Sequence, residues 1–185
     1  MGEYYTGHGD QYAPTDEYLR RRLQTMDPEV FEHFIADVWE TLGWETRVVG
    51  EPGDKGIDVI ATGEHGDGRT ETQLIQAKRY GPNTTVGSPE VQQYASLRLQ
   101  EEGVDTVTIV TTGTFSSQAE EMAPELAVEL VDGEDLLEVI DALDSWAVVA
   151  EYFEELVLPE HVGERSDAGG ETAEGILERV RGWFR

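Results

Sequence analysis

Two short apolar runs, separated by a glycine-rich break, constrain the fold of this chain more than any other feature. They cover residues 53–60 and 73–80, and each has the length and composition of a β-strand. The break at residues 63–68 is rich in glycine, as a hairpin loop is. The sequence therefore predicts two neighbouring strands joined by a hairpin.

The predicted hairpin brings polar side chains together. Because side chains alternate between the two faces of a strand, Gln76 and Lys78 point to the same face. Pairing of the two strands places Asp58 beside them. A carboxylate, an amide oxygen and an ammonium group are then expected at one point on a sheet.

Capping residues and apolar spacing predict the surrounding elements. Asp27 and Pro28 favour the start of a helix whose apolar residues repeat at helical spacing up to Gly43. The predicted elements are a helix at 27–43, strands at 44–49, 53–60, 73–80, 106–111 and 127–131, and helices at 88–102, 116–123 and 134–143. Strands connected through helices require a mixed sheet with helices on both faces, so the expected fold class is α/β.

Three regions are expected along the chain. Residues 1–26 form a polar N-terminal extension, with one or two helical turns at residues 15–23. Residues 27–144 form the main domain. Residues 145–185 form a helical C-terminal extension with a linker near residues 163–170.

The net charge is the strongest compositional feature. Asp and Glu number 39 against 13 Lys and Arg, which gives a formal net charge of −26. A nucleic-acid mimic is one interpretation, but the acids are spread along the chain, which favours halophilic adaptation to high internal salt. The chain has no cysteine, and its four histidines lack ligand spacing, so thiolate and zinc sites are not expected. Without a long apolar run or a signal-peptide pattern, a cytoplasmic protein with no membrane contact is expected.

Lysine is almost eliminated from the chain. Only Lys55 and Lys78 are present, and both lie in the segment of the predicted hairpin. Arginine can supply simple charge, but it presents a planar fork rather than a compact ammonium group and cannot be deprotonated. The position of the two lysines therefore favours a chemical role.

The predicted cluster contains the donors that a hard divalent cation prefers. Asp58 offers a carboxylate, Gln76 an amide oxygen and Ala77 a backbone carbonyl, which suit Mg²⁺, with Mn²⁺ as an alternative. Glu32, at the edge of the buried stripe of the first helix, can restore the negative charge that Gln76 lacks, directly or through water. Lys78 can orient an attacking water and offset charge on a phosphate. The same residues also fit a surface hairpin with a salt bridge and a first-turn Glu favoured by the helix dipole.

Several sequence blocks occur in the order that a known nuclease family has. They are Phe31-Glu32, Leu42-Gly43-Trp44, Gly53-Asp54-Lys55-Gly56-Ile57-Asp58, Gln76-Ala77-Lys78-Arg79-Tyr80, Val86-Gly87, Val91-Gln92, Thr111-Thr112 with Phe115 and Ala119, and Leu130-Val131-Asp132-Gly133-Glu134. In this combination the chain resembles the Mrr-like catalytic domain of type IV restriction endonucleases, in the PD-(D/E)XK nuclease superfamily. The resemblance implies a restriction-endonuclease-like core, a central mixed sheet flanked by helices, and makes residues 27–144 the nuclease domain.

The resemblance also implies a role for each matched residue. Asp58 corresponds to the metal-binding aspartate and Lys78 to the catalytic lysine. Gln76 takes the place of the second acid in the motif name, as is usual in the Mrr-like branch. Glu32 is similar to the helix glutamate that completes the site.

Three further residues are candidates for contacts to DNA. They are Arg79, Gln92 and Lys55, which stands where glycine is common in this branch. Because residues 1–26 are too short for a DNA-recognition domain, a separate recognition partner is also considered. The sequence does not indicate which DNA sequence or modification is recognised.

The expected function is Mg²⁺-dependent hydrolysis of DNA phosphodiester bonds by an endonuclease of restriction or a related defence role. A homodimer is expected, because two copies can cut both strands. Two alternatives remain open: a repair or junction-resolving nuclease with the same chemistry, and a non-catalytic DNA-binding or interaction module that retains the nuclease fold.

Overall fold

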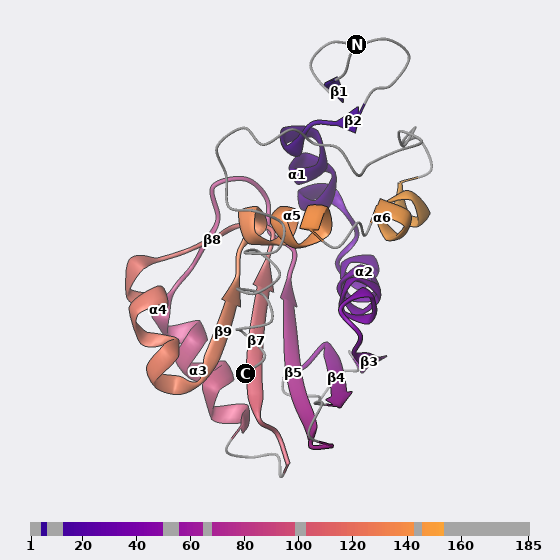
Figure 1. Ribbon diagram of the computed structural model, residues 1–185. Coiled ribbons are helices and arrows are strands. Elements are labelled where there is room, and N and C mark those ends of the chain that lie inside the picture. The colour runs from indigo at the N-terminus through magenta and orange to yellow at the C-terminus, as the bar shows by residue number, and fades with distance from the viewer. Residues whose placement is uncertain are drawn as a thin grey trace.

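A five-stranded mixed sheet forms the centre of the protein in the computed structural model (Figure 1). The structure describes residues 5–6, 13–49, 56–64, 68–98, 103–142 and 146–153. The strand order is β3-β4-β5-β7-β9, with β3, β4 and β5 antiparallel and β5, β7 and β9 parallel. The strands are β3 (Glu45–Val48), β4 (Val59–Glu64), β5 (Thr70–Lys78), β7 (Thr106–Thr111) and β9 (Val128–Val131). The expected α/β class with a mixed sheet is confirmed.

Helices cover both faces of this sheet (Figure 1). One face packs against α1 (Asp16–Thr25), α2 (Pro28–Thr41), α5 (Gly133–Ala142) and α6 (Trp146–Tyr152). The other packs against α3 (Ser88–Arg98), α4 (Ser117–Met122) and the 3₁₀ turn η1 (Pro124–Leu126). Two small sheets pair β1 (Tyr5–Thr6) with β2 (Ala13–Pro14) and β6 (Thr85–Val86) with β8 (Thr114–Phe115). None of the described helices is long and apolar enough to cross a membrane.

The start of α2 follows from its first residues. The Asp27 side chain accepts hydrogen bonds from the backbone N–H groups of Glu29 and Val30, and Pro28 occupies the first turn. Such a cap stabilises a helix by about 1 kcal/mol relative to alanine. Five large apolar residues of the helix are fully buried, namely Phe31, Phe34, Ile35, Val38 and Trp39, whereas Val30 in the first turn is exposed.

The central strand β5 contributes to two cores because its side chains alternate. Ile75 packs with Val59 and the residues of α2, whereas Leu74 packs with Val107 on the α3 side. Both faces of β5 are therefore buried, as expected for a central strand. Each fully buried side chain of this kind contributes about 1.5–3 kcal/mol by removal from water.

The register of the sheet places the predicted site residues of β5 and the adjoining Asp58 near the carboxyl ends of the parallel strands. Val59 pairs with Ile75, and the Asp58 N–H donates to the Ile75 carbonyl at 3.0 Å, so Asp58 continues the ladder opposite Gln76. Lys78, the last residue of β5, pairs with Thr111, the last residue of β7. The carboxyl ends of β5 and β7 lie near the start of β4 and the N-terminal end of α2 in Figure 1.

The first strand of the hairpin lies further along the chain than predicted: residues 56–58 were expected to be strand, but β4 begins at Val59. Strand β4 continues through Gly63 and Glu64, which pair with Glu71 and Thr70, although residues 63–68 were expected to be the break. A side chain at Gly63 would lie 3.0 Å from the Trp44 ring, so glycine is required there by close packing rather than by a turn. Residues 50–55 and 65–67 lie outside the described residues.

The N-terminal helix is part of the hydrophobic core, although a polar extension was expected there. Helix α1 buries Leu19 and Leu23 in the same core as α2 and β5. The domain boundary at residue 27 remains a prediction, but the core includes residues on both sides of it. The expected C-terminal helix is present as α6, and the linker near residues 163–170 lies outside the described residues.

Candidate active site

Asp58 and Gln76 lie in direct contact, just before the start of β4 and near the carboxyl end of β5. Oδ2 of Asp58 accepts hydrogen bonds from Gln76 Nε2 and, at 2.7 Å, from the backbone N–H of Ala77. Asp58 is 8% exposed and Gln76 is 5% exposed. The predicted meeting of a carboxylate and an amide on this hairpin is therefore found.

The side-chain oxygen of Gln76 is the most informative atom of the site. Among the described residues, Gln76 Oε1 is buried and has no hydrogen-bond partner. A buried acceptor without a partner costs about 1–3 kcal/mol. Such an atom beside a carboxylate is a donor set that suits a hard divalent cation.

Gly56 keeps the space beside this oxygen open. Its φ is +82°, and a Cβ built there would lie 2.9 Å from Gln76 Oε1 and 3.2 Å from the Tyr94 ring. Any other residue would be strained by the positive φ and would crowd the amide. Glycine at this position therefore allows the positive φ of the backbone and leaves space beside the amide oxygen.

The backbone of Ala77 fits the same donor set. The N–H and C=O groups of one residue in a strand point to the same neighbouring strand. Because the Ala77 N–H meets Asp58, the Ala77 carbonyl faces the side on which Asp58 lies. No group of three His, Cys, Asp or Glu side chains in the described part of the chain is close enough to hold a metal ion, so an ion here depends on the Gln76 and Ala77 oxygens and on water.

The pKa of the Asp58 carboxyl is raised above its ordinary value. Burial raises its pKa to about 6, and the negative charge of Glu32 acts in the same direction. The Ala77 N–H, the Lys78 ammonium and the Gln76 amide lower the pKa but do not outweigh burial. An additional positive charge beside Asp58 would favour the ionised form.

Lys78 lies on the same face of β5 as Gln76, over an aromatic ring. Its Nζ is 5.1 Å from the centroid of the Tyr94 ring on α3. Burial lowers the pKa of Lys78, but a hydrogen bond to Tyr94 and the charges of Tyr94, Tyr80 and Asp58 outweigh it, and the pKa is raised. Lys78 is therefore an ammonium ion at neutral pH, suited to stabilising negative charge rather than to acting as a base.

Glu32 approaches the site from the first turns of α2. It is partly buried, and burial together with the negative charge of Glu29 raises its pKa. Its charge also raises the pKa of Asp58, so the two carboxylates are within electrostatic range of each other. This position agrees with a second carboxylate that completes the site; its role remains a prediction.

Two of the three candidate DNA-contact residues, Arg79 and Gln92, have their printed contacts away from Asp58 and Gln76. The Arg79 Nη1 donates to the Gln24 carbonyl of α1 at 3.4 Å, while its buried Nε has no hydrogen-bond partner among the described residues. Gln92 lies on the exposed surface of α3 and donates to the Met122 Sδ on α4 at 3.2 Å. Lys55 lies outside the described residues. Contacts between these residues and DNA remain predictions.

Sequence reasoning did not identify Tyr94 or Gly56 as site residues. Tyr94 lies in the helix predicted at residues 88–102 and is only 5% exposed, so an aromatic residue is expected there for packing alone. Its contact with Lys78 depends on how α3 packs against β5. The glycines of the segment indicated a turn, but not that one of them would face an amide oxygen.

A second polar cluster lies on the opposite face of the same sheet. Trp39 Nε1 donates to Gln73 Oε1 at 2.6 Å, and Gln73 Nε2 donates to Glu129 Oε2 at 3.2 Å. Thr108 also donates to Glu129, at 3.4 Å. Burial, and then the charge of Glu71, raises the pKa of Glu129 to about 8. This cluster joins α2, β5, β7 and β9 and was not predicted.

Comparison with known proteins agrees with this architecture. A family model described as restriction endonuclease, Mrr_cat, matches residues 23–140, well over half of the chain. No protein of curated function matches the sequence.

Two solved structures share the fold. The MspJI restriction endonuclease in complex with a 27-mer oligonucleotide is 21% identical with a TM-score of 0.55, over 88% of this chain and 38% of that chain. The DNA modification-dependent restriction endonuclease AspBHI is 20% identical with a TM-score of 0.61, over 74% of this chain and 40% of that chain. The chain thus spans about two-fifths of the length of either neighbour.

Proposed function

The chain belongs to the Mrr catalytic-domain family of restriction endonucleases, and from this premise we propose that it is a metal-dependent endonuclease that hydrolyses DNA phosphodiester bonds. A single observation carries the proposal. The buried Asp58 carboxylate contacts Gln76, whose side-chain oxygen has no hydrogen-bond partner among the described residues, and the positive charge of Lys78 acts on the same carboxylate.

Asp58, the Gln76 oxygen and the Ala77 carbonyl would hold the cation, with Glu32 adding negative charge directly or through water. Mg²⁺ is the proposed ion and Mn²⁺ the alternative, because both prefer oxygen ligands. When bound, the ion supplies Lewis-acid activation of the phosphate and of water. The residues supply the rest: Lys78 holds a fixed positive charge where the phosphate develops negative charge, and Tyr94 fixes the position of that ammonium.

The biological role follows from the family and from the charge of the chain. We propose a restriction or related defence role in the cytoplasm, of the type IV, Mrr-like kind. The net charge of −26 repels DNA at low salt, so activity is proposed to require concentrated salt, where the Debye length is about 3 Å at 1 M. A homodimer would cut both strands, and target recognition is assigned to a separate domain or partner.

Plasmid nicking tests this function. Supercoiled DNA incubated with the protein and Mg²⁺ in molar KCl should be nicked, and chelation should stop the reaction. Lys78→Ala should lower the rate by about 10²–10³-fold, the cost of removing one preorganised transition-state donor. Arg98→Gln, which removes a charge from the exposed end of α3, is the matched control. Absence of nicking by the wild-type protein, or equal nicking by Lys78→Ala, would contradict the proposal.

A further inference from the structure

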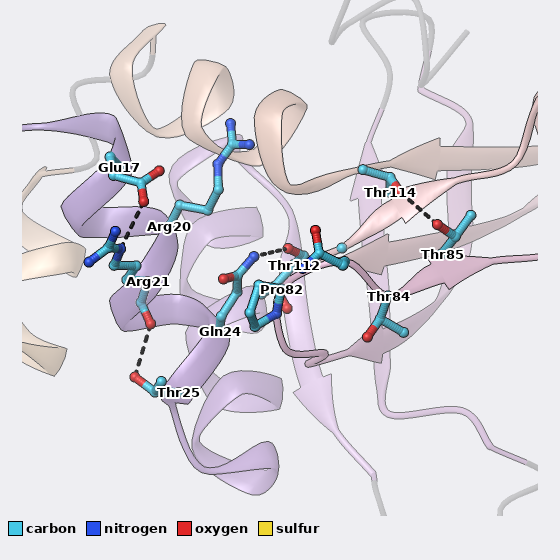
Figure 2. A pocket seen from close by; sticks show the side chains of 12 residues that line it. Glu17, Arg20, Arg21, Gln24, Thr25, Pro82, Thr84, Thr85, Thr112 and Thr114 are labelled. Carbon is cyan, nitrogen blue, oxygen red and sulfur yellow. Dashed lines mark hydrogen bonds and ion pairs between the residues drawn. The ribbon is translucent and has the colours of Figure 1, made fainter.

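An open cavity lies between α1 and the loops that follow β5 and β7, apart from Asp58, Gln76 and Lys78 (Figure 2). Its volume is about 780 Å³. One wall is formed by Arg20, Arg21 and Gln24 of α1, and the opposite wall by the segments around Thr84 and Thr114.

The cavity is held at the carboxyl edge of the sheet, next to the candidate active site. Gln24 Nε2 donates to the Thr112 carbonyl at 3.1 Å, which ties α1 to the loop after β7. The Thr112 N–H in turn donates to the Lys78 carbonyl at 3.2 Å. Thr112 therefore connects the cavity wall to the end of β5 that carries Lys78.

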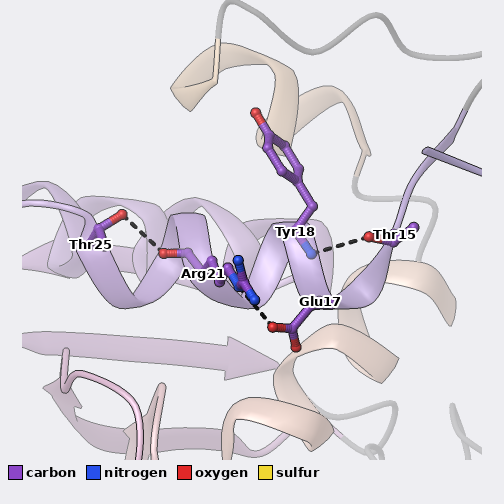
Figure 3. Close-up of polar contacts among 5 residues, drawn as sticks. All are labelled: Thr15, Glu17, Tyr18, Arg21 and Thr25. Carbon is purple, nitrogen blue, oxygen red and sulfur yellow. Dashed lines mark hydrogen bonds and ion pairs between the residues drawn. The ribbon is translucent and has the colours of Figure 1, made fainter. Parts of the chain in front are cut away.

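The three consecutive arginines of α1 have different surroundings. The Arg21 Nε donates to Glu17 Oε1 at 2.8 Å in an exposed ion pair (Figure 3). The Arg22 guanidinium lies 5.2 Å from the centre of the Phe153 ring. Among the described residues, the Arg20 guanidinium has no hydrogen bond or ion pair, and its side chain extends away from Glu17 and Arg21 (Figure 2).

The opposite wall carries hydroxyl groups. Thr84, Thr85 and Thr114 line it, and the hydroxyls of Thr85 and Thr114 lie 3.1 Å apart. Guanidinium and hydroxyl groups in the lining of one cavity are donors that can bind phosphate oxygens of DNA without reading sequence. The one acid of the lining, Glu17, is paired with Arg21. Such a cationic lining is unusual in a chain in which acids outnumber bases by 39 to 13.

We propose that this cavity binds a backbone phosphate of the DNA substrate next to the scissile phosphate, with Arg20 as the cationic contact. The proposal rests on the proposed nuclease function and adds a binding subsite to it. Arg20 positions the strand along the edge of the sheet, whereas Lys78 acts on the phosphate that is cleaved. Arg21 and Arg22 serve the helix and its packing.

Binding to a short fluorescein-labelled DNA duplex, followed by fluorescence anisotropy over a series of KCl concentrations, tests the proposal. Asp58→Asn is used as the background, because it prevents cleavage during titration. In this background Arg20→Gln should weaken binding about tenfold, the value of one charge-assisted hydrogen bond. It should also reduce the slope of log K against log salt by about 0.9, the loss of one phosphate contact.

Arg98→Gln is the matched control, since it removes the same charge from the exposed end of α3, away from the cavity. It should change affinity by less than about twofold. Equal effects of Arg20→Gln and Arg98→Gln would overturn the proposal, because the contribution would then be only general charge. Thermal unfolding of both variants should match that of the background protein.

Two further outcomes separate this proposal from the nuclease function. Plasmid nicking by the wild-type protein, together with unchanged duplex binding by Arg20→Gln, would overturn the subsite and leave the nuclease function standing. Neither binding nor nicking by the wild-type protein would overturn both. Inorganic phosphate is the probe for a free-anion site: if it binds in an Arg20-dependent way while duplex affinity is independent of Arg20, the cavity takes small anions and the proposal fails.

Discussion

Two glutamines of β5, three residues apart, face opposite sides of the sheet and have opposite hydrogen-bonding states. Both polar atoms of Gln73 have a partner: its oxygen accepts from Trp39 at 2.6 Å and its nitrogen donates to Glu129 at 3.2 Å. Gln76 donates to Asp58, but its buried oxygen has no partner among the described residues. Both side chains are almost fully buried, with exposures of 0% and 5%.

This difference in hydrogen bonding separates a buried amide that stabilises the fold from one that is available to bind a ligand. The Gln73 amide, which has a partner at its oxygen and at its nitrogen, links α2, β5 and β9 in a low-dielectric core. Its burial therefore costs little free energy. An amide with a free acceptor costs about 1–3 kcal/mol, a loss that a bound cation would recover. On this interpretation Gln73 is structural and Gln76 belongs to the candidate active site.

The sharpest test replaces the glutamine at each position with leucine, which has no hydrogen-bonding group in its side chain. Gln76→Leu should lower plasmid nicking by about 10²–10³-fold, because it removes an oxygen ligand and the hydrogen bond that orients Asp58. Stability should change by less than about 1 kcal/mol, since an unsatisfied acceptor is removed as well. Mg²⁺ binding by calorimetry and unfolding in urea measure the two effects. A Gln76→Leu variant with full activity would remove the amide from the site.

Gln73→Leu should show the reverse pattern. It leaves the Trp39 indole N–H and the Glu129 carboxyl without their partner, so unfolding should be easier by about 2–4 kcal/mol. Mg²⁺ affinity of the folded protein should stay within about twofold of wild type, because the side chain lies on the other face of β5. Denaturant unfolding and calorimetry on the same samples check this. Loss of metal binding without loss of stability would contradict the assignment of Gln73 to the structural cluster.

Alanine substitutions at two glycines test whether the space beside the Gln76 oxygen matters. Gly56 and Gly103 both have φ of +82°, so alanine introduces the same backbone strain at each, about 1–2 kcal/mol. Only at Gly56 does the new methyl group meet the Gln76 oxygen and Tyr94, because no atom of the described residues lies within 4 Å at Gly103. Gly56→Ala should therefore cost about 1–3 kcal/mol more and should also weaken Mg²⁺ binding. Equal effects of the two variants would show that the amide oxygen has room to move.

The smallest expected effect is a pH dependence of stability from the structural cluster. Glu129 has its pKa raised from 4.5 to about 8, so the folded state binds more protons than the unfolded state between these values. The contribution is fully present below pH 4.5 and is lost as the pH rises through about 8. Glu129→Gln should remove it, so that the wild-type protein loses a few degrees of Tm relative to the variant between pH 5 and 8.5. Because the whole chain also becomes more negative, the difference between the two proteins is the quantity to measure; a constant difference would contradict the raised pKa.

Much of the fold follows from local patterns. Strand β7 begins and ends where its β-branched run does, and α2 begins at the Asp27–Pro28 cap, because these signals involve neighbouring residues. The bounds of the first hairpin strand were predicted less well, since Gly63 is needed for packing against Trp44 and not for a turn. The burial of α1 was missed because its buried residues are only two, the leucines Leu19 and Leu23.

The candidate site divides in the same way. The contact between Asp58 and Gln76 follows from strand alternation and pairing, which are properties of the backbone. The contacts of Lys78 with Tyr94 and of Gln24 with Thr112 join segments that are distant in sequence, so no local pattern indicates them. The roles of Asp58, Gln76, Lys78 and Glu32 in catalysis remain predictions that the variants above test.

The sequence by itself determined the order of helices and strands, the mixed α/β class and the edge of the sheet at which acid, amide and lysine gather. Those features depend on spacing and on residues that are close along the chain. Only the tertiary structure decided that both polar atoms of the Gln73 amide have partners while the Gln76 oxygen has none among the described residues, and that Arg20 lines the cavity without the ion pair that Arg21 makes. The hydrogen-bonding state of a buried group depends on which distant side chains pack around it, and that information is not contained in any local segment.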